Sequence, residues 1–166
     1  MIAMNLADLE HSGCARAEGP RLWVRVPGDW PAEGENRIGY VSILRLIEAV
    51  RELHWRRDVS PHVDPARLDS ITRTLTADFM SPVLADTQII CTYALRWVRP
   101  RSYGLGVTLA HDEGEDLAQV ELANVFIDPD TLRPIAPHPN LTAILRKQLP
   151  QTEGNEPLAE QMARTA

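Results

Sequence analysis

The chain has 166 residues, 44% of them hydrophobic, and a net charge of −6. This length and composition predict one globular domain with a substantial core, and the acidic balance argues against a general nucleic-acid binder, whose surface would be basic. No apolar run reaches the roughly 18 residues of a membrane span, and the first twenty residues lack the apolar stretch of a secretory signal, so we expect a cytoplasmic protein without membrane segments.

The first twenty residues show no hydrophobic periodicity and are rich in small and polar residues. We expect a flexible N-terminal arm over 1–20, part of which could pair with a sheet. The first clear strand pattern covers 22–26 and ends at Pro27 and Gly28. The loop that follows, 29–37, carries several carboxylates.

A helix is predicted over 38–54, with Asn36 as a plausible N-cap. Its apolar residues cover a sector that is too wide for a helix with one solvated face. We therefore expect a sheet or a partner to wrap most of this helix. The apolar face consists of Tyr40, Ile43, Leu44, Ile47 and Val50, flanked by Leu46 and Leu53.

Most of the chain after this helix has the pattern of extended strands. In 70–79, apolar residues from Ile71 to Phe79 alternate with threonines and an aspartate, which is typical of an antiparallel sheet with one wetter face. Further elements are strands over 87–98, 103–111 and 117–127 and a short helix over 140–148. The polar tail 151–166 is expected to be flexible, which leaves one domain over 21–150.

Four stretches in a fixed order carry a family resemblance: VRVPGD, GYVSILRLIEAVREL, TADFMSPVLADTQI and VFIDPDTLRPIAP. Together they resemble the hotdog-fold acyl-CoA thioesterases, in the branch of 4-hydroxybenzoyl-CoA thioesterase. The resemblance covers about 21–149 and implies an α+β fold in which a long antiparallel sheet wraps one central helix.

The resemblance also implies a function and an assembly. The expected reaction is hydrolysis of an acyl-CoA or acyl-carrier-protein thioester, with coenzyme A or phosphopantetheine present only as part of the substrate and no other cofactor. The expected assembly is a homodimer or homotetramer in which sheet edges pair and active sites lie at the interface.

Thioester hydrolysis needs a carboxylate that attacks the carbonyl or activates a water, and donors that stabilise the oxyanion. Free backbone N–H groups near Gly39 and Tyr40, at the start of the helix, could supply the donors with help from the helix dipole. In the family, an aspartate is often followed by Gly-His at this point. The present chain has Gly39-Tyr40 and a longer loop.

The position of the catalytic acid is therefore open. Counting forward from the strand selects Asp29, whereas counting back from the helix selects Glu33 and places Arg37 in the histidine position; Glu35 is a third candidate. The alternative is that these acids are solvated loop charges, one of which caps the helix and pairs with Arg37.

Three residues of the helix have two interpretations each. Glu48 is an alternative catalytic acid, but Arg51 three residues later predicts an intrahelical ion pair. His54 could contact substrate or be a hydrogen-bonded core residue. Tyr40 could donate to substrate or be a buried ring. Asn36 and Arg37, just before the helix, are further candidates for substrate binding.

Arg96, Arg99 and Arg101 surround a predicted turn near Trp97 and Tyr103. They could hold the phosphates and adenine of coenzyme A or meet an acidic carrier protein, or they could be ordinary surface charges. The other histidines are scattered without cysteines at ligand spacing, so we expect no metal site.

Two other functions compete with hydrolysis. A hotdog dehydratase or cyclase would act on a polyketide-like thioester, although the histidine-acid pair usual for dehydratases is not visible in the sequence. A non-catalytic acyl-binding module would suit the missing histidine and the longer loop.

Overall fold

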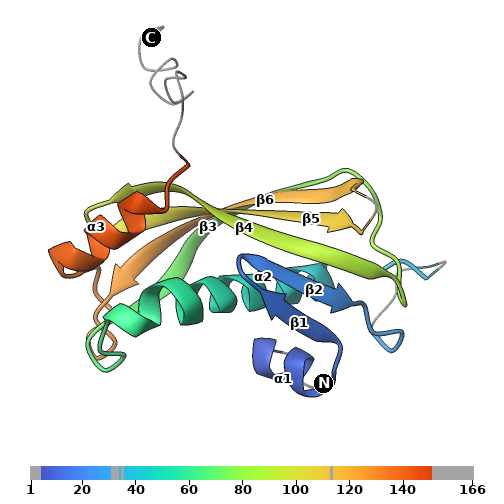
Figure 1. Cartoon of the computed structure of the whole chain (residues 1–166), viewed down its shortest axis with the longest axis horizontal. Coiled ribbons are helices and arrows are strands. Elements are labelled where there is room, and N and C mark those ends of the chain that lie inside the picture. Colours follow the sequence, from blue (N-terminus) through green and yellow to red (C-terminus); the bar gives the residue numbers. More distant parts are fainter. Residues whose placement is uncertain (1–4, 31–33, 35, 113, 151–166) are drawn as a thin grey trace, which may run out of the picture.

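The computed structural model describes residues 5–30, 34, 36–112 and 114–150. Six antiparallel strands form one sheet in the order β1-β2-β4-β5-β6-β3, and α2 lies along one face of it (Figure 1). The strands are β1 (Ala15–Glu18), β2 (Arg21–Arg25), β3 (Asp69–Phe79), β4 (Gln88–Arg99), β5 (Ser102–His111) and β6 (Asp116–Ile127). The helices are α1 (Leu6–His11), α2 (Tyr40–His54) and α3 (Pro139–Lys147). The expected α+β arrangement, a long antiparallel sheet around one central helix, is confirmed.

The central helix starts two residues later than predicted and ends at His54, as predicted. It begins at Tyr40 with Gly39 as the N-cap, so the N-cap assigned to Asn36 was wrong. The reason is that 37–38 pair with 83–84 across an antiparallel bridge: Ile38 N–H donates to the Val83 carbonyl, and the Asn36 carbonyl accepts from Ala85 N–H. After His54 the chain continues through a π-helical turn η1 (Trp55–Val59) and a 3-10 turn η2 (Ser60–His62).

The expected flexible arm is ordered in its described part. Helix α1 buries Leu6 and Leu9 in the core, and β1 pairs with β2 along its whole length. Glu52 of α2 accepts the Leu6 N–H, and Glu10 of α1 pairs with Arg56. The domain therefore begins before residue 21. The expected tail 151–166 lies outside the described residues.

One side of α2 is buried against the sheet and the other is not. The buried side includes Leu46, Ile47 and Val50, which belong to one continuous core with the inward residues of β4, β5 and β6. Tyr40 and Leu44 are exposed, although both were expected to be wrapped. The described chain thus leaves part of the wide apolar sector uncovered.

A bulge in β3 changes which residues face α2. The register shifts between Thr72 and Thr74, so Ile71 pairs with Val125 whereas Leu75 pairs with the buried Leu122. Side chains alternate between faces along a strand, so Ile71 and Leu75 lie on opposite faces. The expected uninterrupted alternation of 70–79 was wrong at this point, and Thr72 faces inward.

A second bulge bends β4 and brings two large side chains onto the outer face of the sheet. The register shifts between Leu95 and Trp97, and both Arg96 and Trp97 lie across glycines of β5. A Cβ at Gly104 would lie 2.2 Å from Trp97 Nε1, so glycine is required beneath this ring. None of the helices in the described part of the chain is both long and apolar enough to cross a bilayer.

Candidate functional site

A pocket of about 280 Å³ lies at the N-terminal end of α2. One wall comes from the segment that enters the helix, and the other comes from the end of β3 and the turn after it. The lining residues are Arg37, Ile38, Tyr40, Ile43, Phe79, Met80, Ser81, Pro82 and Val83. Among these lining residues Arg37 carries a charge, Tyr40 and Ser81 carry hydroxyl groups, and the others are apolar.

The start of α2 supplies hydrogen-bond donors beside this pocket. Gly39 has an extended backbone, and its carbonyl accepts from Ser42 and Ile43, which closes the first turn. Within the described residues, the N–H groups of Gly39, Tyr40 and Val41 have no acceptor. Such groups at the positive end of a helix dipole suit a carbonyl oxygen that gains negative charge.

Tyr40 and Arg37 both border the pocket, as expected of residues that contact a substrate. The Tyr40 side chain is 58% exposed, and its ring packs against Phe79 with 4.8 Å between centroids. Arg37 is fixed by its bridge to Leu84 across the segment that enters the helix. The interpretation of Tyr40 as a buried ring was wrong. Asn36 has a φ of 61° and lies beside Arg37 but does not line the pocket.

The candidate acids differ in position. Asp29 is exposed in the turn after β2 and is not among the residues that line the pocket. Glu33 and Glu35 lie outside the described residues. A further acid approaches from the β5–β6 turn, where Glu115 accepts a hydrogen bond of 3.2 Å from Ser81 Oγ.

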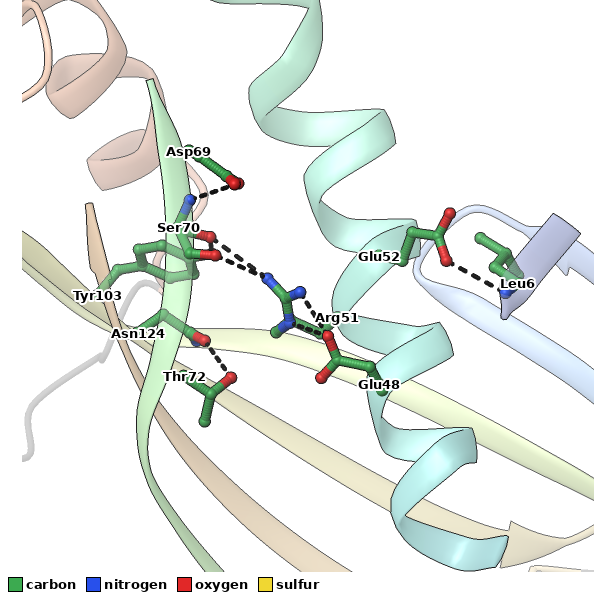
Figure 2. A network of polar contacts seen from close by, with 9 residues as sticks. All are labelled: Leu6, Glu48, Arg51, Glu52, Asp69, Ser70, Thr72, Tyr103 and Asn124. Atoms are coloured by element: carbon green, nitrogen blue, oxygen red, sulfur yellow. Dashed lines mark hydrogen bonds and ion pairs between the residues drawn. The ribbon is translucent and has the colours of Figure 1, made fainter. Parts of the chain in front are cut away.

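Glu48 lies farther along α2 in a network of polar contacts (Figure 2). It accepts from Arg51 Nε at 2.7 Å, so the predicted ion pair within the helix is confirmed. Arg51 Nη1 also donates to the carbonyl and hydroxyl oxygens of Ser70 on β3, at 3.3 and 3.4 Å. The Ser70 hydroxyl lies 3.1 Å from the Tyr103 hydroxyl.

His54 is fully buried at the far end of α2 and does not line the pocket at the start of this helix. Its ring lies between those of Tyr93 and Tyr103, with centroids 5.4 and 5.3 Å away. Neither ring nitrogen has a partner among the described residues, and burial lowers its pKa to about 4. Because α2 rises about 1.5 Å per residue, His54 is roughly 20 Å from the start of the helix. The structure does not bring it to the pocket, and it is a core residue.

The three arginines of the β4–β5 hairpin are also remote from the pocket within one chain. Arg96 pairs with Glu121 on the outer face, and Arg99 lies over the ring of Trp97. The hairpin adjoins the start of β3, whereas the pocket adjoins its end at Phe79. The intervening ten residues of strand, which span roughly 33 Å, separate Arg99 and Arg101 from the pocket, whereas Arg96 is kept from it by its place on the outer face beside Glu121.

Sequence reasoning missed much of the pocket wall and of the network. Phe79 to Val83 carry no pattern beyond the Ser-Pro strand break, which marks the turn but not its role. The inward direction of Thr72 depends on the bulge. No three His, Cys, Asp or Glu side chains in the described ranges are grouped as metal ligands.

Comparisons with known proteins give structural similarity without sequence similarity. No family model matches the chain, and no curated protein matches it. The probable thioesterase YbaW of Escherichia coli has a TM-score of 0.68 at 16% identity, over 78% of this chain and 98% of that one. The dynemicin thioesterase, whose structures describe polyene binding, has a TM-score of 0.67 at 16% identity, over 81% and 100%.

A 1,4-dihydroxy-2-naphthoyl-CoA thioesterase from Synechocystis has a TM-score of 0.64 at 9% identity, over 82% of this chain and 98% of that one. Identities this low show the fold alone. The chain has the hotdog fold, and its structural neighbours include many thioesterases.

Proposed function

We propose that this chain is a thioesterase that hydrolyses an acyl-CoA or acyl-carrier-protein thioester in the pocket at the start of α2. The observation that carries the proposal is that helix N–H groups without an acceptor among the described residues, Arg37 and several apolar side chains converge at one pocket. The thioesterase neighbours of the same fold support it, and one of them is named for an acyl-CoA substrate. The expected location is the cytoplasm.

In this proposal the thioester carbonyl lies at the helix end. Its oxygen accepts from the N–H groups of Tyr40 and Val41, and Arg37 adds positive charge nearby. On one route a carboxylate removes a proton from water, whose oxygen attacks the carbonyl carbon. On the other route the carboxylate attacks that carbon itself and forms a mixed anhydride, which a water molecule then hydrolyses to release the acid and restore the carboxylate. On both routes the C–S bond breaks, and the thiolate leaves and takes up a proton.

Four carboxylates are candidates for this role. Glu33 and Glu35 precede the pocket residue Arg37 in sequence, and Asp29 follows β2. Glu48 is on the helix face that leads away from the pocket, but Arg51 holds it. Replacing each acid by its amide should identify one variant whose rate of thiol release falls by at least about 100-fold.

The assay measures free thiol from a panel of acyl-CoA substrates. Asp130→Asn, an exposed acid in the turn after β6, is the matched control and should keep full activity. If all four amide variants and Glu115→Gln, which changes the acid bonded to the pocket residue Ser81, keep full activity, the carboxylate mechanism is wrong.

The assembly we propose is a homodimer that pairs β3 with its copy. In the described part of the chain one edge of this long strand has no neighbour in the sheet, and its residues Ile71 and Leu75 are exposed on opposite faces. The opposite edge, β1, is short and carries the charged Arg16 and Glu18, which discourages pairing. A β3 dimer would bring the two pockets toward a shared interface, and a tetramer would require a second contact.

A non-catalytic acyl-binding module is the second candidate. It is favoured by one observation, that no described lining residue of the pocket is a carboxylate. Tight binding of acyl-CoA without thiol release would support it. A dehydratase is disfavoured because no histidine lines the pocket and His54 is in the core. Mass spectrometry of the intact thioester would detect loss of water or ring closure.

A further inference from the structure

A polar cluster lies between α2 and the sheet, beyond the pocket. It consists of Arg51 from α2, Ser70 and Thr72 from β3, Tyr103 from β5 and Asn124 from β6. Figure 2 shows Arg51 reaching from α2 toward β3, with Ser70, Thr72 and Asn124 on the facing side. A polar group in a core normally has a hydrogen-bond partner among its neighbours, so a buried donor without one requires an explanation.

One donor in the cluster has no acceptor. The Asn124 side chain is fully buried, and its Oδ1 accepts from Thr72 Oγ1 at 2.9 Å. Its Nδ2 has no hydrogen-bond partner among the described residues. Leaving such a group unpaired lowers stability, whereas an apolar residue of similar size would not. Its presence is explained if a bound molecule supplies the acceptor.

Two rows of side chains connect the pocket with this cluster. On α2, Tyr40, Leu44 and Glu48 are four residues apart and therefore lie along one face of the helix. On β3, the inward residues from Phe79 through Leu75 lead to Thr72. The rows start at the contact between Tyr40 and Phe79 and pass the exposed Leu44 and Leu75.

The length and access of this path suit an acyl chain. Tyr40 and Arg51 are separated by roughly 16 Å along the helix axis. The path is apolar in its middle and becomes polar at Glu48 and Arg51. The side chain of Arg51 is 19% exposed and that of Glu48 is 58% exposed, so the approach to the cluster is partly open, whereas Asn124 is fully buried and is reached only if the side chains around it move.

The charges around the cluster limit which chemical group the distal end of the acyl chain can carry. Arg51 is already paired with Glu48 and bonded to Ser70, and Asp69 lies next to Ser70 and accepts its N–H. Another carboxylate would meet two acids and one committed guanidinium. A neutral oxygen can instead accept from the unpaired amide without adding charge.

We infer that the acyl group lies along these two rows and carries a neutral oxygen, a hydroxyl or a ketone, in its distal part, where Asn124 Nδ2 donates to it. This inference rests on the proposed function, because it places the thioester at the start of α2. It names the substrate class as long-chain oxygenated acyl thioesters.

The test compares three substrates of equal chain length: dodecanoyl-CoA, ω-hydroxydodecanoyl-CoA and dodecanedioyl-CoA. The hydroxylated substrate should have a kcat/KM about tenfold above that of the plain chain, because a buried donor gains its missing partner. The dicarboxylic substrate should be the poorest. Asn124→Leu should abolish the preference for the hydroxyl while still hydrolysing dodecanoyl-CoA.

Two further variants separate recognition from a structural role. Thr72→Val removes the donor that orients the Asn124 amide, so it should reduce the preference even if Asn124→Leu fails to fold. Thr108→Val, on the opposite face of β5, should keep the preference for the hydroxylated substrate. Asn124→Leu should also raise the thermal midpoint. A lower midpoint with an equal loss on all substrates would overturn the inference.

Failure of the inference is distinguishable from failure of the proposed function. Equal kcat/KM values for the plain and hydroxylated substrates would overturn the inference and leave the thioesterase proposal intact. If no substrate is hydrolysed, the thioesterase proposal fails. The inference is then tested by titration calorimetry, which compares the affinity for the thioether analogues of dodecanoyl-CoA and ω-hydroxydodecanoyl-CoA. About tenfold tighter binding of the hydroxylated analogue would support it, and equal binding would overturn it.

Discussion

The imidazole of His54 packs edge-on against the ring of Tyr93, with 5.4 Å between centroids and 80° between planes. The pKa of His54 is lowered to about 4, mainly by desolvation on burial; Asp58 acts in the opposite direction, and Arg51 and Arg57 contribute to the lowering. In the unfolded state His54 is therefore protonated as the pH falls below about 6.5, whereas in the folded state it stays neutral until the pH approaches about 4.

This relationship predicts an acid-sensitive stability. The contribution of neutral His54 is complete above about pH 6.5 and is lost as the pH falls toward about 4, by about 3 kcal/mol in all. Urea unfolding at a series of pH values measures it. His54→Phe keeps the ring contacts and should flatten this part of the profile. His62→Gln, at an exposed histidine, should leave the slope unchanged; equal slopes for wild type and His54→Phe would contradict the assignment.

Gly104 should tolerate no side chain while Trp97 lies across it. A Cβ there would be 2.2 Å from Trp97 Nε1, so Gly104→Ala should lower the free energy of unfolding by about 2 kcal/mol through forced displacement of the ring. Trp97→Val in the same chain should recover most of the loss that Gly104→Ala causes. Chemical denaturation of the single and double variants measures the coupling. Additive effects would show that the ring is not the obstacle.

Arg37 should matter for rate rather than for folding. It is exposed at the pocket, so Arg37→Gln should leave the thermal midpoint nearly unchanged. Loss of its charge beside the developing oxyanion should lower kcat by about 10- to 100-fold. Steady-state assays of thiol release test this, with Arg133→Gln, an exposed arginine after β6, as the matched control. A change confined to KM would assign Arg37 to substrate binding alone.

The free edge of β3 should control assembly. Ile71 is 49% exposed on this edge, and Ile71→Glu should place like charges opposite each other in a β3 dimer. Sedimentation should then show a shift from dimer to monomer together with loss of hydrolysis. Leu132→Glu, at an exposed leucine in the turn after β6, should remain dimeric. A wild-type chain that sediments as a monomer at all concentrations would refute the β3 dimer.

The sequence by itself determined the sheet and the helix. Burial of one face gives strands an alternating pattern and gives 40–54 its wide apolar sector. The elements from 22 to 148 could therefore be predicted from hydrophobic pattern and turn residues. Short elements were missed because they contain too few residues to show such a pattern. Helix α1 has only Leu6 and Leu9 to indicate a buried face, and its burial depends on contacts with α2.

The tertiary structure decided which residues meet. The bulge at Thr72 turns a polar side chain inward to Asn124, fifty-two residues later. The extended segment before α2 moves the helix start to Gly39, and the folding of the sheet places His54 in the core, far from the pocket. Each of these depends on long-range hydrogen bonds or desolvation, which no local pattern encodes. The hydrophobic pattern determines which face of each helix or strand is buried, whereas contacts between segments distant in sequence determine which residues form the candidate site.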